Sequence, residues 1–177
     1  MYAPYDTGTY QAALKFIKPD DYVLDIGAGD LRLARQMAKI ARKVYAVEIK
    51  PELISQAADQ HPIPGNLIPV CADARSWEFP TEITVGVLLM RHCAHFQQYA
   101  KKLATNGAQR LITNARWRMG VELITLNAPR LGFEKLEIGW YACECGSAGF
   151  KSGSPELLTP ATEAVIHEVT NCPNCRG

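Results

Sequence analysis

The chain has 177 residues, a length that fits one domain or one domain with a small appendage. Lysine and arginine total 19 against 18 aspartate and glutamate, and 47% of the residues are hydrophobic, which excludes a disordered chain and a uniformly basic nucleic-acid coat. No apolar run approaches the roughly 20 residues that span a bilayer, and the N-terminus shows no signal-peptide pattern. We therefore expect a cytoplasmic protein that does not associate with membranes.

Short apolar runs alternate with helical patterns through the first two thirds of the chain. The runs are predicted strands, and they cover residues 22–26, 43–48, 67–71, 83–90 and 110–113. Apolar residues at helical spacing predict helices over residues 33–41, 51–60 and 96–104. Strands that are apolar throughout are typical of a parallel sheet covered on both faces. The expected fold class is therefore α/β, a Rossmann-like, doubly wound and mostly parallel sheet.

A glycine loop follows the first predicted strand, where the sequence reads Asp25-Ile26-Gly27-Ala28-Gly29-Asp30. Glycines allow a ligand to approach the backbone closely, and an acid after the second strand, here Glu48, can accept both hydroxyls of a ribose. A dinucleotide enzyme needs a third glycine, which is absent, and Asp30 would place a negative charge beside a pyrophosphate. Asp30 can also cap the helix that follows. Asp25 instead suits a cationic ligand such as the sulfonium and ammonium of S-adenosylmethionine.

Three segments resemble the motifs of the class I S-adenosylmethionine-dependent methyltransferases. Residues 23–29 are similar to the first motif, residues 44–48 to the second, and Cys71-Ala72-Asp73-Ala74 to the third. The resemblance covers residues 1–140 and implies an S-adenosylmethionine-binding methyltransferase domain. It also implies a cofactor role for five residues, with Gly27 and Gly29 toward the methionine part, Asp25 near its amine, Glu48 at the ribose and Asp73 at the adenine amino group.

The methyl acceptor is open at this point. Residues 27–33 also resemble the loop of a group of protein-lysine methyltransferases that act on mitochondrial proteins, but Leu31 stands where that group has glycine. After the fourth strand the sequence lacks the Asn/Asp-Pro-Pro-Tyr motif of adenine methyltransferases, which counts against N6-adenine methylation. His92 and His95 stand there instead and are alternative candidates for a base, or are plain loop residues. The catalytic residue and the oligomeric state are unknown, and the acceptor is either a macromolecule, protein or RNA, or a small molecule.

Basic residues gather in the middle of the chain. Residues 91–130 hold seven lysines and arginines against Glu122 alone, whereas residues 131–177 hold three basic and six acidic residues. In a parallel sheet, Arg116 and Arg118 follow the fifth strand and are expected beside the methyl donor, where they would guide an anionic acceptor. The alternative is that these charges only solvate the surface.

The last third of the chain has weaker patterns. We expect a helix over residues 119–127 and a strand over residues 132–141. Residues 164–169 alternate apolar and polar side chains and are expected to pair with that strand as an antiparallel hairpin. The Gly/Ser/Pro-rich residues 146–160 are expected to form a loop or an excursion between them.

Four cysteines lie at the ends of these last two predicted strands. Cys143-Glu144-Cys145-Gly146 and Cys172-Pro173-Asn174-Cys175 supply four thiolates, which suit a closed tetrahedral zinc site, and the segment 141–177 resembles a zinc ribbon. Iron, free thiols and disulfides are the alternatives. Cys71 and Cys93 are expected to pack as small hydrophobes. The site either staples the last two strands of the methyltransferase sheet or recruits a partner, and a non-catalytic zinc-containing adaptor module is the second hypothesis for the whole chain.

Overall fold

The computed structural model describes residues 3–116 and 120–175. Within these residues six strands form the larger sheet: β1 (Tyr22–Ile26), β2 (Lys43–Glu48), β3 (Leu67–Cys71), β4 (Val85–Leu88), β5 (Arg110–Thr113) and β6 (Glu122–Thr125). The strand order is β3-β2-β1-β4-β5-β6, and every neighbouring pair is parallel except β5 and β6. The predicted α/β fold class is confirmed.

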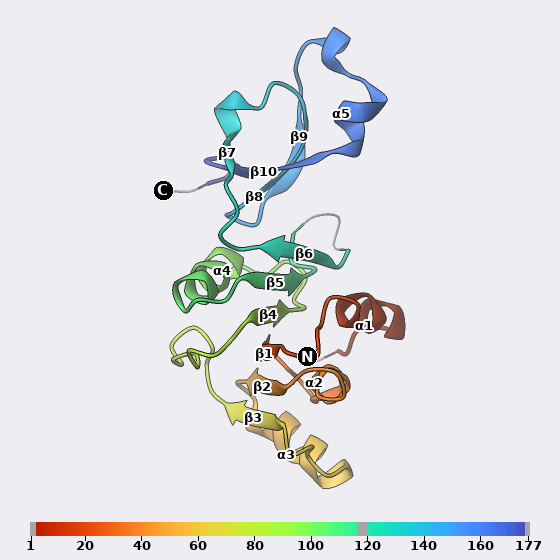
Figure 1. Cartoon of the computed structure of the whole chain (residues 1–177), viewed down its shortest axis with the longest axis vertical. Helices are drawn as coiled ribbons and strands as arrows, with labels where there is room; N and C mark the ends of the chain where they lie inside the picture. Colours follow the sequence, from red (N-terminus) through yellow and green to blue (C-terminus); the bar gives the residue numbers. More distant parts are fainter. Residues whose placement is uncertain (1–2, 117–119, 176–177) are drawn as a thin grey trace.

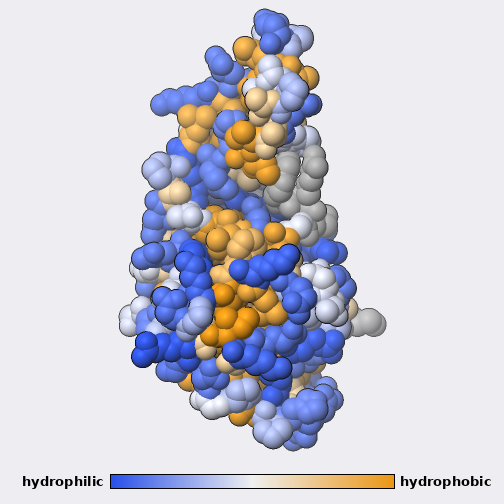
Figure 2. Space-filling model, turned by 45° about the vertical axis from the view of Figure 1, so that its right-hand side comes forward, coloured by the Kyte–Doolittle hydropathy of each residue, from blue (hydrophilic) through white to orange (hydrophobic). Residues whose placement is uncertain are grey.

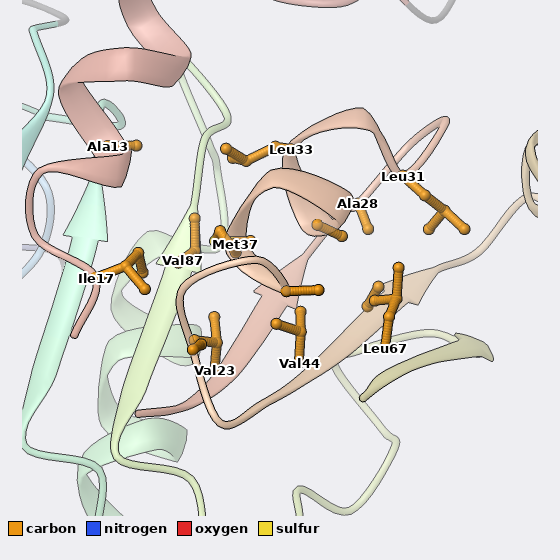
Figure 3. Packing of buried hydrophobic residues seen from close by; sticks show 14 of the residues in the cluster. Ala13, Ile17, Val23, Ala28, Leu31, Leu33, Met37, Val44, Leu67 and Val87 are labelled. Atoms are coloured by element: carbon orange, nitrogen blue, oxygen red, sulfur yellow. The ribbon is translucent and has the colours of Figure 1, made fainter. Parts of the chain in front are cut away.

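Helices cover both faces of this sheet: α1 (Thr7–Leu14), α2 (Arg32–Met37), α3 (Pro51–Gln60) and α4 (Phe96–Thr105). Side chains of α1, α2 and α3 pack with Val23, Val44 and Val87 in one buried cluster, part of which is shown in Figure 3. Side chains of α4 pack with Leu24 and Leu88 on the opposite face. Successive strand residues therefore enter different clusters, as the two-residue period of a strand requires.

Two local expectations are corrected. Residues 122–125 form the antiparallel strand β6 rather than part of a helix; the first residue of that predicted helix, Met119, lies outside the described residues. The N-cap position of α2 is Leu31 rather than Asp30, although an Asp30 carboxylate oxygen still accepts the backbone N–H of Arg32 at 3.3 Å.

A second, smaller sheet lies beyond β6 at the upper end of Figure 1. In the described part of the chain its strands are β7 (Leu131–Gly132), β8 (Gly139–Cys143), β9 (Ala148–Lys151) and β10 (Ile166–Thr170), in the order β7-β10-β8-β9. The 3₁₀ turns η2 (Phe133–Lys135) and η3 (Pro155–Leu157) and the helix α5 (Pro160–Ala164) fill the connections. The division into units at residue 140 stays a prediction, and the first strand of this sheet begins at Leu131.

The predicted pairing of the last strands is wrong. β8 and β10 are parallel neighbours, and they belong to a sheet of their own rather than to the methyltransferase sheet. The antiparallel hairpin of this region joins β8 to β9, inside the stretch that was expected to be a loop. A parallel pair needs a long crossover connection, and residues 144–165 provide one that includes β9 and α5.

The small sheet buries little of its apolar surface. Its buried cluster consists of Leu136, Tyr141, Cys143, Val169 and Cys172. Phe150, Leu158 and Val165 are exposed, and Figure 2 shows hydrophobic side chains at the surface near this upper end. A core of this size needs further stabilisation. No helix in the described residues is long and apolar enough to cross a membrane.

Candidate cofactor site and metal centre

A cavity of about 470 Å³ lies at the carboxyl ends of β1, β2, β3 and β4. β1 lies between β2 and β4, so the chain runs outward in opposite directions from this point, which is where open α/β sheets bind ligands. Asp25 and Gly27 line the cavity from β1 and the loop after it, Glu48 from the end of β2, and Asp73 from the loop after β3. The structure thus brings together four of the five predicted cofactor residues.

Asp25 is a buried carboxylate at the end of β1 that faces this cavity. It is 3% exposed, and its Oδ2 atom has no hydrogen-bond partner. Burial, with a further contribution from the charge of Glu48, raises the pKa of Asp25 from 3.8 to about 7. A cationic group of a ligand would pair with this carboxyl group and favour its ionised form.

This buried carboxylate makes stability depend on pH. Because the pKa of Asp25 is higher in the folded state than in the unfolded chain, its favourable contribution is complete below pH 4 and is lost as the pH rises through about 7. Asp25→Asn removes this dependence. We measure the stability difference as the free energy of unfolding of the Asp25→Asn variant minus that of the original chain, both without ligand. This difference should increase by about 3 kcal/mol between pH 4.5 and pH 8.5. Urea unfolding at both pH values measures this difference; an equal offset at the two pH values would contradict it.

The glycine loop and Glu48 hold each other in place. The backbone N–H of Gly29 donates to Glu48 Oε2 at 2.9 Å, and the N–H of Lys50 donates to Oε1 at 3.0 Å. Gly27 and Gly29 have φ angles of +75° and +57°, in the region that favours glycine. A Cβ on Gly27 would also lie 3.0 Å from Met90 Cε. Gly29 does not line the cavity itself but fixes the carboxylate that does.

Asp73 lies at the rim of the cavity, after β3. The Arg75 guanidinium donates to both Asp73 oxygens, with Nη2 2.6 Å from Oδ2, and the backbone N–H of Arg75 donates to Oδ1. These hydrogen bonds lower the pKa of Asp73 to about 2. The carboxylate is therefore ionised at neutral pH and retains lone pairs for a further donor.

The loop after β4 forms another wall of the cavity. Leu89, Met90 and Arg91 line it together with His95, whereas His92 does not. His92 instead has a φ angle of +58° and is exposed.

An N-terminal wall is the part of the cavity that the sequence did not predict. Pro4 and Tyr5 line it, and the hydroxyl of Tyr5 accepts the backbone N–H of Arg91 at 2.9 Å, while the Arg91 guanidinium lies over the Tyr5 ring. The signal for the helix behind it was Asp6, whose side chain accepts the N–H of Thr9 as an N-cap.

Arg116 does not lie in this cavity, contrary to the expectation that it guides an acceptor. Its side chain is 1% exposed and is bound by Glu122 and Glu168. Other basic side chains of residues 91–130 are likewise held internally, since Arg110 pairs with Asp21 and Lys102 donates to backbone carbonyls. Arg118 lies outside the described residues. Much of the middle basic cluster therefore serves the fold.

The four predicted metal ligands come together at one end of the small sheet. The Sγ atoms of Cys143, Cys145, Cys172 and Cys175 all lie within 4.8 Å of one another. The Cys143–Cys175 and Cys145–Cys172 Sγ separations are 3.5 and 3.6 Å, too long for disulfides, whose S–S length is about 2.05 Å. Zinc–sulfur bonds of about 2.3 Å in a tetrahedron imply sulfur separations of about 3.8 Å. The cluster has the size of a tetrahedral metal site.

Cys71 and Cys93 stand apart from this cluster. Cys71 is exposed at the end of β3, so the expectation that it packs as a buried hydrophobe is wrong, whereas Cys93 is half-buried against the α4 cluster.

Comparison with known proteins identifies a matching family and similar proteins. The profile of the methyltransferase domain family matches residues 23–115, more than half of the chain. The "Probable ribosomal RNA small subunit methyltransferase A" of Methanosarcina mazei is 39% identical over 64 residues, which are 36% of this chain and 24% of that protein. Its counterpart from Methanosarcina barkeri is 40% identical over 62 residues, 35% of this chain and 22% of that protein. The aligned part is thus about a quarter of the length of these relatives.

Solved structures share the fold. A dimethyladenosine transferase from Plasmodium falciparum superposes with a TM-score of 0.54 at 22% identity, over 61% of this chain and 41% of that one. The 23S rRNA methyltransferase ErmE superposes with a TM-score of 0.52 at 24% identity, over 62% of this chain and 46% of that one. Precorrin 8W decarboxylase also superposes with a TM-score of 0.54 at 20% identity, over 63% of this chain and 64% of that one. These similarities therefore establish only the fold. Through the family profile, which covers more than half of its length, the chain belongs to the methyltransferase domain family.

Proposed function

We propose that the chain holds S-adenosylmethionine with Asp25, Gly27, Gly29, Glu48 and Asp73 and transfers its methyl group to RNA in the cytoplasm. The unpaired Asp25 oxygen supports a cationic ligand at the end of β1. Glu48 uses one backbone donor on each oxygen, which leaves lone pairs for two ribose hydroxyls. Asp73 can accept the adenine amino group beside its contact with Arg75. Since the sulfonium already activates the methyl group, positioning and exclusion of water supply the acceleration.

Replacing Glu48 tests this cofactor assignment. Glu48→Ala removes the charged acceptor for the ribose and leaves the Gly29 and Lys50 amides unpaired, so we expect S-adenosylmethionine binding to weaken by about 1–3 kcal/mol. Calorimetry measures the change. Glu52→Ala is the matched control, because this acid is exposed in the first turn of α3 and loses the same charge. Equal affinity of both variants would contradict the role of Glu48.

The charge at the cavity mouth carries the proposal of an RNA acceptor. Lys50 and Arg91 line the cavity, are exposed, and have no acidic ion-pair partner among the described residues. Phosphate groups are the natural counter-charge for such a rim. Two relatives bear the names of ribosomal RNA methyltransferases, which agrees with this choice for the part of the chain that they share. Protein lysine and small molecules are the acceptors that the experiment distinguishes.

Methyl transfer to a cell extract tests the acceptor. The extract is incubated with the chain and S-adenosylmethionine labelled on its methyl group, and is then split by nuclease and by protease. We expect label that nuclease releases and protease does not. The Lys50→Glu, Arg91→Glu variant should lose this transfer while it keeps calorimetric binding of S-adenosylmethionine. Label that only protease releases would overturn the choice of RNA.

For the cysteine cluster we propose structural zinc. Four thiolates fill a tetrahedral site and leave no open position, so the metal would hold the small sheet together rather than take part in methyl transfer. The sulfur separations support this ligand set.

A further inference from the structure

A second cavity lies on the other side of α4 from the cofactor cavity. It has a volume of about 350 Å³ and is bounded by α4, by β6 with the residues after it, and by Glu144 in the β8–β9 turn. His95 and Tyr99 face the cofactor cavity, whereas Phe96, Ala100 and Ala104 face this one. The helix α4 is therefore a shared wall.

The fold explains why this space is open. Three helices cover one face of the large sheet, but α4 is the helix of the described residues that packs on the other. Phe96, Ile124 and Leu126 are less than 7% exposed and form an apolar floor where the sheet extends past α4. The volume falls in the range of small-ligand pockets.

Cationic groups stand around this apolar floor. Lys101 is exposed at the edge. The Arg130 side chain is 15% exposed, and its Nη1 donates to the Leu126 carbonyl at 3.1 Å. Its buried Nε atom lies 3.6 Å from a Glu168 oxygen and has no hydrogen-bond acceptor. Arg116 also lines the space but is occupied by its two glutamates. Glu144 is the acid among the residues that line the cavity, against the cations Lys101 and Arg130. An apolar floor with cationic donors at its edge suits a ligand with a flat apolar body and an anionic group, which is the chemistry of a nucleotide.

We propose that this cavity binds a nucleotide of the RNA acceptor that flanks the methylated one, a proposal that rests on RNA being the acceptor. The base would lie on the floor of Phe96, Ile124 and Leu126, and its phosphate would meet Lys101 and Arg130. An α-helix with its side chains is about 10–12 Å across, and α4 alone separates the two cavities. The RNA strand therefore crosses α4 with one base in each cavity.

Filling the cavity tests this inference. Ala104→Trp places a ring over the floor, and Lys101→Glu reverses the charge at the edge without touching the core. Both are expected to raise KM for RNA about tenfold, the effect of losing one stacked base, with kcat and S-adenosylmethionine affinity unchanged. Lys39→Glu is the control, since this exposed lysine follows α2 on the opposite face of the sheet, and it should leave KM within about twofold of the original chain.

Direct binding separates this inference from the proposed function. A fluorescent single-stranded oligoribonucleotide reports RNA binding without methyl transfer. If the original chain binds it and both variants bind about tenfold more weakly, the cavity is an RNA site even where RNA is not methylated. If both variants bind it as the original chain does, the cavity takes something else, such as a helix of a partner protein, and the inference fails.

Discussion

Replacing Cys172 and Cys175 together by serine is expected to remove the bound metal and to unfold the small sheet while the large sheet remains folded. The reason is the size of the core, because two of the five buried residues of this cluster, Cys143 and Cys172, belong to the proposed ligand set. A structural zinc site contributes apparent binding free energies of about 10–16 kcal/mol in small domains, far more than the remaining apolar contacts supply.

Metal content and hydrogen exchange measure the two parts of this result. We expect about one zinc per chain before the change and almost none after it, with amide protection lost in β8 and β10 and retained in β1 and β4. The Cys71→Ser, Cys93→Ser double variant is the control, since neither thiol lies near the cluster. An unchanged metal content in the Cys172, Cys175 variant would contradict the site.

The cofactor half of the fold could be predicted because its signals are local. Strands β1, β2, β3 and β5 are short, mainly apolar runs, and Gly27 and Gly29 mark the turn after β1, where the backbone has positive φ. Since parallel strands end at one edge, the acids that follow them had to meet there. Asp25, Glu48 and Asp73 do so.

The last third could not be predicted in the same way. An alternating strand such as β10 shows which side chains face one way but not in which direction its neighbour runs, so its pairing with β8 was expected to be antiparallel and is parallel. For β6 the period of two appears in the burial and not in the sequence: Ile124 and Leu126 are buried, but the apolar Leu123 is exposed together with Thr125.

The role of Arg116 depends on a long-range contact that no local pattern shows. It follows β5 by three residues, yet Glu168 in β10 lies 52 residues further along the chain. Counting charges along the sequence placed this arginine on an open surface. In the folded chain it joins the large sheet to the small one.

Arg116→Ala is therefore expected to destabilise the junction between the two sheets rather than to reduce acceptor binding. The guanidinium Nε lies 2.9 Å from a Glu122 oxygen, Nη1 lies 2.9 Å from a Glu168 oxygen, and Nη1 also reaches the carbonyl of Cys143 at 3.4 Å. Breaking a buried ion pair by removing one partner costs about 3–5 kcal/mol. Since the two glutamates are partly exposed and can be hydrated, we expect a loss of about 2–4 kcal/mol in the free energy of unfolding.

Urea unfolding measures this loss, and Lys43→Ala is the control, because its pairing with Glu82 is exposed to solvent and contributes little to stability. Arg116→Lys should recover only part of the stability, since an ammonium cannot bind two carboxylates with the planar fork of a guanidinium. Because Arg116 lies outside the cofactor cavity, S-adenosylmethionine affinity should stay within error in all three variants. Unchanged stability of Arg116→Ala together with a raised KM for the acceptor would contradict this structural role and would indicate that Arg116 binds the substrate.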